Sequence, residues 1–257
     1  MQNLKKSYDG RNLVLRGIDL VIYPGQIIGY IGPNGAGKTT TVKILIGMLA
    51  GFSGEVTVCG HSVSDQPLEV KKRIGYVPET AALYDLLTPN EYLQFIGQLY
   101  RIPLKEVKKR SGEMLNLFGL ASQVDDRMNS FSKGMKQKVL IIASLIHDPD
   151  VLFLDEPLAG LDANAAMVVK EILAQLASKG KTIFYCSHVM DVVERICDRI
   201  IIIDNGAIIA DGTFDELQPM SKGESLERIF TQLTGSSGHK RIAQEFISSF
   251  QSEEAND

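Results

Sequence analysis

The chain has 257 residues, of which 44% are hydrophobic, and it carries a formal net charge of −4 at pH 7. This composition can bury a large core, and the mild acidity gives no sign of a nucleic-acid-binding protein. The longest apolar stretches fall far short of the ~20 residues needed to span a bilayer, and the three cysteines form no paired framework.

The N-terminal segment contains short candidate strands separated by glycines, which predicts an antiparallel β part. Residues 26–31 then form a candidate buried strand, and residues 38–49 have helical spacing, so the loop 32–37 joins a strand end to a helix N-terminus. Its glycines allow successive N–H groups to turn towards phosphate oxygens. The run therefore predicts a nucleotide-binding loop made of Gly32, Pro33, Asn34, Gly35, Ala36, Gly37, Lys38, Thr39 and Thr40. Lys38 is predicted to reach the β- and γ-phosphates, and Thr39 to place its hydroxyl on Mg²⁺.

The middle of the chain is helical in pattern, with apolar residues three and four apart in residues 89–95 and 105–118. From residue 150 to residue 199 candidate strands and helices alternate, as a doubly wound parallel sheet requires. Asn205-Gly206 separates two apolar runs and predicts a β-hairpin.

The candidate strand 151–154 ends in Asp155 and Glu156. Four apolar residues before two acids predict a strand buried on both faces that delivers charge at the ligand-binding edge of the sheet. We expect Asp155 to contact Mg²⁺ and Glu156 to accept a proton from, or orient, the water that attacks the γ-phosphate. Taken alone, both acids are also compatible with a solvated strand end.

His188 follows the candidate strand 182–186, where a lone histidine is more often structural than catalytic. The other histidines lack the spacing of metal ligands and are expected at the surface, namely His61, His147 and His239.

Several motifs resemble those of the ATP-binding cassette (ABC) ATPases, in the order of that family across roughly residues 3 to 215. Phe-Ser-Lys-Gly-Met-Lys-Gln-Lys at 131–138 resembles the signature sequence, and Ala-Gly-Leu-Asp at 159–162 resembles the D-loop. Ser187-His188 resembles the switch histidine, Gly-Tyr-Val-Pro-Glu at 75–79 resembles the Q-loop, and Tyr8 stands where the family places an adenine-stacking aromatic.

The resemblance implies an α/β P-loop NTPase cassette over residues 1–218, with a parallel core sheet, an N-terminal antiparallel β part and a helical subdomain inserted at about 81–147. Residues 219–257 would form a short, partly flexible C-terminal extension. Two cassettes, identical or paired, would face each other head to tail around two Mg-ATP. Each ATP would be held by the P-loop of one cassette and by Ser132, Gly134 and Met135 of the other, with Asp162 at the dimer contact.

The implied cofactors are ATP and Mg²⁺. The implied catalytic residues are Glu156, His188 and Glu79, and the implied metal ligands are Thr39, Asp155 and Glu79. Glu79 replaces the glutamine usual in the family, and we hypothesise that its carboxylate still coordinates Mg²⁺. The chain also begins closer to Tyr8 than is usual, which predicts a clipped first strand.

The resemblance implies the ATP-hydrolysing subunit of an ABC transporter, of the exporter-type branch, working with an integral membrane permease at the cytoplasmic face of the membrane. Candidate contacts for that permease are Tyr84, Leu86, Leu87, Tyr92 and Phe95. As isolated side chains, such residues lie about twice as often in the core as at an interface. Two alternatives stay open: an ABC-family ATPase not attached to a transporter, and a degenerate module that switches without turnover. The transported substrate is not indicated.

Overall fold

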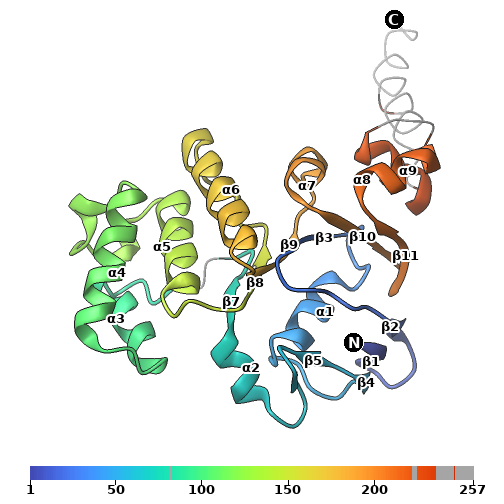
Figure 1. Cartoon of the computed structure of the whole chain (residues 1–257), viewed down its shortest axis with the longest axis horizontal. Helices are drawn as coiled ribbons and strands as arrows, with labels where there is room; N and C mark the ends of the chain where they lie inside the picture. The colour runs from blue at the N-terminus through green and yellow to red at the C-terminus, as the bar shows by residue number, and fades with distance from the viewer. Residues whose placement is uncertain (81–82, 222–224, 236–245, 247–257) are drawn as a thin grey trace, which may run out of the picture.

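The computed structural model describes residues 1–80, 83–221, 225–235 and 246. A six-stranded sheet in the order β11-β10-β3-β9-β8-β7 lies at its centre, with β11 antiparallel and the other strands parallel (Figure 1). The predicted α/β fold with a parallel core sheet is therefore confirmed. Its strands are β3 (Ile27–Ile31), β7 (Ile74–Val77), β8 (Val151–Asp155), β9 (Thr182–Cys186), β10 (Arg199–Asp204) and β11 (Ala207–Gly212).

The alternation of side chains along the strands divides the interior into two hydrophobic cores, one on each face of the sheet. Ile28 and Tyr30 of β3 face the N-terminal β part and α1 (Lys38–Leu45). Ile27 and Ile31 belong to the second core, which the helices α5, α6 and α7 cover on the opposite face (Figure 1). These helices are α5 (Lys133–Leu145), α6 (Ala163–Ser178) and α7 (Met190–Ile196).

The N-terminal β part contains a three-stranded sheet in the order β2-β1-β4. The expectation that the first strand is an edge strand is wrong, because β1 pairs with β2 on one side and with β4 on the other. Three small elements follow the sheet before the core strand β7. The elements of this part are β1 (Gln2–Ser7), β2 (Leu13–Ile18), β4 (Ser53–Glu55), β5 (Thr57–Val58), β6 (His61–Ser62) and α2 (Pro67–Arg73).

The helical segment predicted between the P-loop and the acidic strand is present, and its helices lie together at one end of the molecule (Figure 1). Thr88 caps α3 (Pro89–Leu99) in a capping box with Glu91. The segment continues with α4 (Leu104–Leu117), two 3₁₀ turns at Ala121–Gln123 and Met128–Ser130, and α5.

After β11 the chain forms α8 (Phe214–Leu217), a 3₁₀ turn (Gln218–Ser221) and α9 (Leu226–Thr234). α9 packs onto α7: Leu226 and Ile229 are fully buried, and the Leu226 N–H donates to the Glu194 carboxylate at 3.0 Å. Residues 236–245 and 247–257 lie outside the described part of the chain. Within the described part, no helix has both the length and the apolar character that crossing a bilayer requires.

The predicted hairpin is confirmed, and its turn packs against two other segments. Asn205 and Gly206 both have positive φ, 46° and 77°, as a two-residue turn of this kind requires. Gly206 N–H donates to the carbonyl of Ala36 in the P-loop at 3.0 Å, and its own carbonyl accepts from Arg16 of β2 at 2.8 Å. A Cβ at position 206 would lie 2.2 Å from the carbonyl oxygen of Val14.

We predict that Gly206→Ala lowers the free energy of unfolding by about 2 to 4 kcal/mol, from backbone strain together with the clash on Val14. The control is Gly180→Ala, which has a similar φ of +88° but open space around the new Cβ, and it should cost only about 1 to 2 kcal/mol. Urea unfolding of both variants measures the difference. Equal losses would contradict a special role for the contact between the turn and β2.

Candidate functional site

The P-loop backbone packs so closely against its neighbours at Gly32 and Gly37 that a side chain at either position would clash. A Cβ at Gly32 would lie 2.2 Å from the carbonyl oxygen of Ile203, and one at Gly37 would lie 2.6 Å from Leu15 Cδ2. Gly37 also has a φ of 108° and is the N-cap of α1. The loop therefore holds a fixed shape at the start of α1, where N–H groups without helical partners and the positive end of the helix dipole favour an anion.

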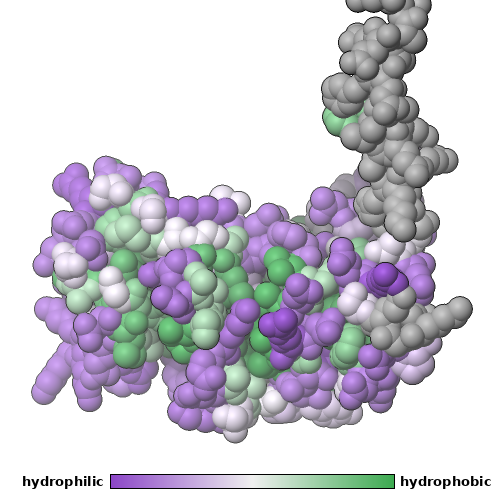
Figure 2. Space-filling view, turned by 90° about the horizontal axis from the view of Figure 1, so that it is seen from above, coloured by the Kyte–Doolittle hydropathy of each residue, from purple (hydrophilic) through white to green (hydrophobic). Residues whose placement is uncertain are grey.

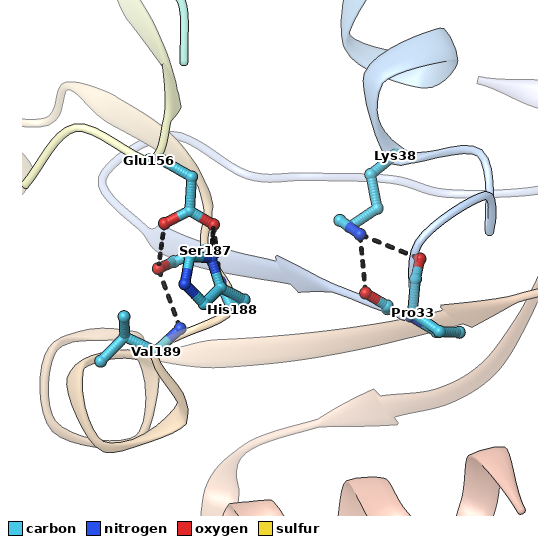
Figure 3. Close-up of polar contacts among 7 residues, drawn as sticks. Pro33, Lys38, Glu156, Ser187, His188 and Val189 are labelled. Carbon is cyan, nitrogen blue, oxygen red and sulfur yellow. Dashed lines mark hydrogen bonds and ion pairs between the residues drawn. The ribbon is translucent and has the colours of Figure 1, made fainter. Parts of the chain in front are cut away.

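Lys38 begins α1 and turns back over the loop (Figure 3). Its ammonium donates to the carbonyl oxygens of Gly32 at 2.6 Å and Pro33 at 3.0 Å. Asn34, Gly35 and Thr39 are exposed beside it. The cation is thus already placed at the mouth of the loop, within reach of a bound phosphate chain.

Tyr8 lies near the same helix and is 62% exposed, so it is not a packing residue of the core. Its hydroxyl lies 3.2 Å from Oγ1 of Thr40 in the first turn of α1. The structure therefore brings together Tyr8 and the P-loop, as the sequence predicts.

Carboxylates gather where β7 and β8 end. Asp155 closes β8, and burial, followed by the charges of Glu79 and Glu156, raises its pKa to about 6, while Lys38 opposes the rise. Glu79 lies two residues beyond β7 and is exposed. No group of three or more acidic, His or Cys side chains within the described residues forms a metal cage. Mg²⁺ needs no such cage, because it is usually bound by one or two carboxylates together with waters and substrate phosphates.

Glu156 is held from two sides by residues that follow β9. Its Oε2 accepts from the Ser187 hydroxyl at 2.9 Å, and its Oε1 accepts from the His188 N–H at 2.7 Å and lies 2.7 Å from the ring Nδ1 (Figure 3). The Ser187 oxygen in turn accepts from the Val189 N–H at 3.1 Å. Glu156 also has a φ of 49°, a strained backbone of the kind that occurs at functional sites.

The signature residues occupy a different part of the molecule. Ser132 is the N-cap of α5, and its oxygen accepts from the Met135 N–H at 3.2 Å. Among the hydrogen bonds and ion pairs of the described residues, none joins Ser132, Gly134 or Met135 to the P-loop. Gly134 instead packs on the D-loop, since a Cβ there would lie 2.4 Å from the carbonyl oxygen of Gly160.

Two polar contacts join α5 to the segment after Glu156. Asp162 caps α6 by accepting from Ala165 at 2.8 Å and forms an ion pair with Lys138 at 3.6 Å. Gln137 is buried, and its amide donates to the carbonyl of Pro157 at 3.0 Å. Sequence reasoning missed Gln137, although an uncharged polar residue on an apolar helix face was a usable signal.

The family model described as ABC transporter matches residues 15–159, more than half of the chain. The chain belongs to the ABC transporter ATP-binding family. As a member of this family it is an ATPase that uses ATP and Mg²⁺. The phosphate-binding loop, the acidic strand end and the histidine described above are consistent with that activity.

Similar proteins include the linearmycin resistance ATP-binding protein LnrL of Bacillus subtilis (strain 168), 40% identical over 225 residues, which cover 88% of this chain and 72% of that protein. Nod factor export ATP-binding protein I of Ralstonia nicotianae is 37% identical over 217 residues, covering 84% and 67%. The solved ATP-binding subunit of an ABC transporter superposes with a TM-score of 0.85 at 32% identity, covering 90% and 97%. A dimeric cassette in a post-hydrolysis state, bound to ADP and Pi, gives a TM-score of 0.76 at 26% identity, covering 82% and 97%.

We predict that Asp155→Asn stabilises the ABC ATPase in the absence of nucleotide and Mg²⁺. The pKa of Asp155 is raised to about 6 in the folded protein, so the protonated carboxyl favours the folded state. That contribution to folding stability is lost as pH rises towards and through 6. The gain in Tm should therefore grow between about pH 4 and pH 6 and level off above, at about 2 to 4 °C after solvent screening. Thermal unfolding measures it, with exposed Asp125→Asn as the control. A gain that does not change with pH would contradict the electrostatic cause.

Proposed function

We propose that this ABC ATPase drives the export of a substrate through a separate membrane subunit, working as a dimer at the cytoplasmic face of the membrane. The observation that carries the proposal is the contact of Glu156 with Ser187 and His188 at the sheet edge that also holds the P-loop. Relatives named for linearmycin resistance and for Nod factor export support the exporter direction.

Within the proposed site, Lys38 exchanges its bonds to the P-loop carbonyls for the β- and γ-phosphate oxygens. Thr39, Asp155 and Glu79 supply the protein oxygens for Mg²⁺, which neutralises charge on the phosphates when it is bound. Tyr8 stacks on the adenine base. Glu156 takes a proton from, or orients, the attacking water, and His188 holds that carboxylate in position.

In the proposed dimer the start of α5 completes the ATP site of the partner. Ser132 uses its oxygen as the acceptor of an N-cap bond, so the hydroxyl proton remains able to donate to a γ-phosphate. The helix dipole of α5 adds positive potential at the same point. Gly134 in the first turn contributes an N–H group, Met135 lies beside it, and Asp162 at the start of α6 lies at the contact between the two chains.

The proposed membrane partner contacts the helical segment. Tyr84 and Leu86 are 62% and 70% exposed, and Tyr84 makes an edge-on aromatic contact with Phe95, with ring centroids 5.8 Å apart. Tyr92, in contrast, is buried. Leu87 is partly buried and packs on the core.

A cavity of about 360 Å³ lies near these residues, and Tyr92 and Ile96 of α3 line part of it. His147 is one of its lining residues, and the expectation of a surface histidine is wrong here. Its ring stacks on Tyr100 at 3.7 Å, its Nε2 lies 2.9 Å from the carbonyl oxygen of Ile74, and burial lowers its pKa.

We predict that Glu156→Gln reduces Mg²⁺-dependent phosphate release by at least about 100-fold, because the amide cannot accept the proton of the attacking water. ATP binding should persist, so the variant should become a stable dimer with Mg-ATP, measured by size-exclusion chromatography with light scattering. Glu171→Gln on the exposed face of α6 serves as the control. Undiminished phosphate release by Glu156→Gln would contradict its assignment.

We predict that the tagged chain co-purifies with a polytopic membrane protein from gently solubilised native membranes. Tyr84→Glu should reduce that recovery more than about tenfold, because it places a charge in an apolar contact. The ATPase rate of the isolated chain should be unchanged. The control is Leu117→Glu, at an apolar position on α4 that is 74% exposed. Recovery of only non-membrane partners would overturn the transporter assignment.

A further inference from the structure

Lys6 is a buried lysine in β1 that the function above does not use. Only 8% of the residue is exposed, and Leu4, two residues earlier, is fully buried. Lysine is almost never buried to this extent without a partner for its charge. None of the salt bridges among the described residues involves Lys6. The question is therefore what holds the ammonium group, and to what effect.

Two main-chain carbonyls hold it. Nζ of Lys6 donates to the carbonyl oxygens of Ala50 at 2.9 Å and Gly51 at 2.8 Å, in the segment that follows the P-loop helix α1. Gly51 has a φ of +69°, and a Cβ there would lie 3.4 Å from Nζ. The lysine thus ties β1 to the chain leaving the far end of α1.

The same ammonium lies over an aromatic ring. Nζ is 5.2 Å from the centroid of the Tyr8 ring, within the range of a cation–π interaction. The Tyr8 hydroxyl is anchored separately, 3.2 Å from Thr40 in the first turn of α1. The ring is therefore held by α1 at its hydroxyl and by Lys6 over its face, while 62% of the residue remains exposed.

We infer that Lys6 is a positioning residue for the adenine base. It covers one face of the Tyr8 ring and holds the ring at a set place relative to Lys38, which leaves the other face for the purine. A cation over one face of the ring also restrains its rotation, so less entropy is lost when the base stacks. The inference rests on the proposed stacking of adenine on Tyr8.

The test compares ATP with a ligand that has no base. Lys6→Met keeps an unbranched buried stem but removes the charge and the donors, so the KM for ATP should rise about 3- to 10-fold with kcat changed less than about twofold. The inhibition constant of inorganic tripolyphosphate should stay the same, because that ligand uses the P-loop alone. Lys5→Met, at the neighbouring position of β1, is the control. Lys6→Gln, which keeps a donor without the charge, replaces Lys6→Met if the latter does not fold.

A double-variant cycle separates this inference from the proposed role of Tyr8. Tyr8→Leu alone should raise the KM for ATP, and adding Lys6→Met should raise it no further, since Lys6 acts through the ring. If Tyr8→Leu leaves the KM unchanged, the stacking role itself fails, and the inference about Lys6 fails with it. If Tyr8→Leu raises the KM, three results overturn only the inference about Lys6. These are that Lys6→Met leaves the KM for ATP unchanged, that it weakens tripolyphosphate binding as much as ATP binding, or that it adds its full effect to that of Tyr8→Leu in the double variant.

Discussion

The close approach of three backbone segments around the P-loop is the constraint on which the rest of the site depends. Gly32 lies against the carbonyl of Ile203, Gly37 lies against Leu15, and Gly206 bonds to Ala36. The three neighbouring segments come from β10, β2 and the β10–β11 turn, so the loop has one shape only when the central sheet and the N-terminal sheet are both assembled. Phosphate binding by backbone N–H groups needs that single shape, because peptide dipoles stabilise charge only where they are already oriented.

Electrostatic strain is the second feature of the site. Asp155 is partly buried beside two other carboxylates, and its raised pKa expresses the cost of that placement. Glu156 adds backbone strain at a φ of 49°. Hydrogen bonds from Ser187 and His188 stabilise the Glu156 carboxylate, and Lys38 offsets part of the charge on Asp155. Such a site costs stability until Mg²⁺ and phosphates bind, a usual consequence of selection for function rather than for maximal stability.

Most of the correct predictions came from local patterns in the sequence. The P-loop, the acidic strand end and the Asn205-Gly206 turn each depend on a few consecutive residues whose backbone or charge requirements are specific. Long-range pairing was harder to predict: β1 is a central strand only because β4 (Ser53–Glu55) returns to its open side. The placement of His147 on Tyr100 likewise depends on how α3 packs against α5.

Buried polar residues show why the remaining features escaped prediction. Lys6 and Gln137 are both held by main-chain carbonyl oxygens of distant segments. Every residue offers such an oxygen, so no residue type at positions 50, 51 or 157 signals the contact. The sequence shows only a polar residue where an apolar one fits the pattern, and this marks the position without identifying its partner.

The surface over the helices of the second core, α5, α6 and α7, is relevant to the contact between the two chains of the dimer. Figure 2, seen from above, shows apolar patches along the middle of a largely hydrophilic face, and α6 exposes Met167 and Val168 at 68% and 42%. Such residues scattered singly are normal on a surface, so this face by itself does not define an interface. The polar contacts of α5 are more specific, because they join two elements that the proposed dimer places at different ATP sites.

Gln137 makes that connection within one chain. It lies little more than one helical turn after Ser132, and its amide donates to the carbonyl of Pro157, the residue that follows Glu156. In the proposed dimer Ser132 contacts the ATP of the partner while Glu156 acts on the ATP of its own chain. A buried hydrogen bond is costly to break, so this bond ties α5 to the Glu156 segment within one chain. In the proposed dimer, one connected unit of each chain therefore reaches both ATP sites, with Ser132 at one site and Glu156 at the other.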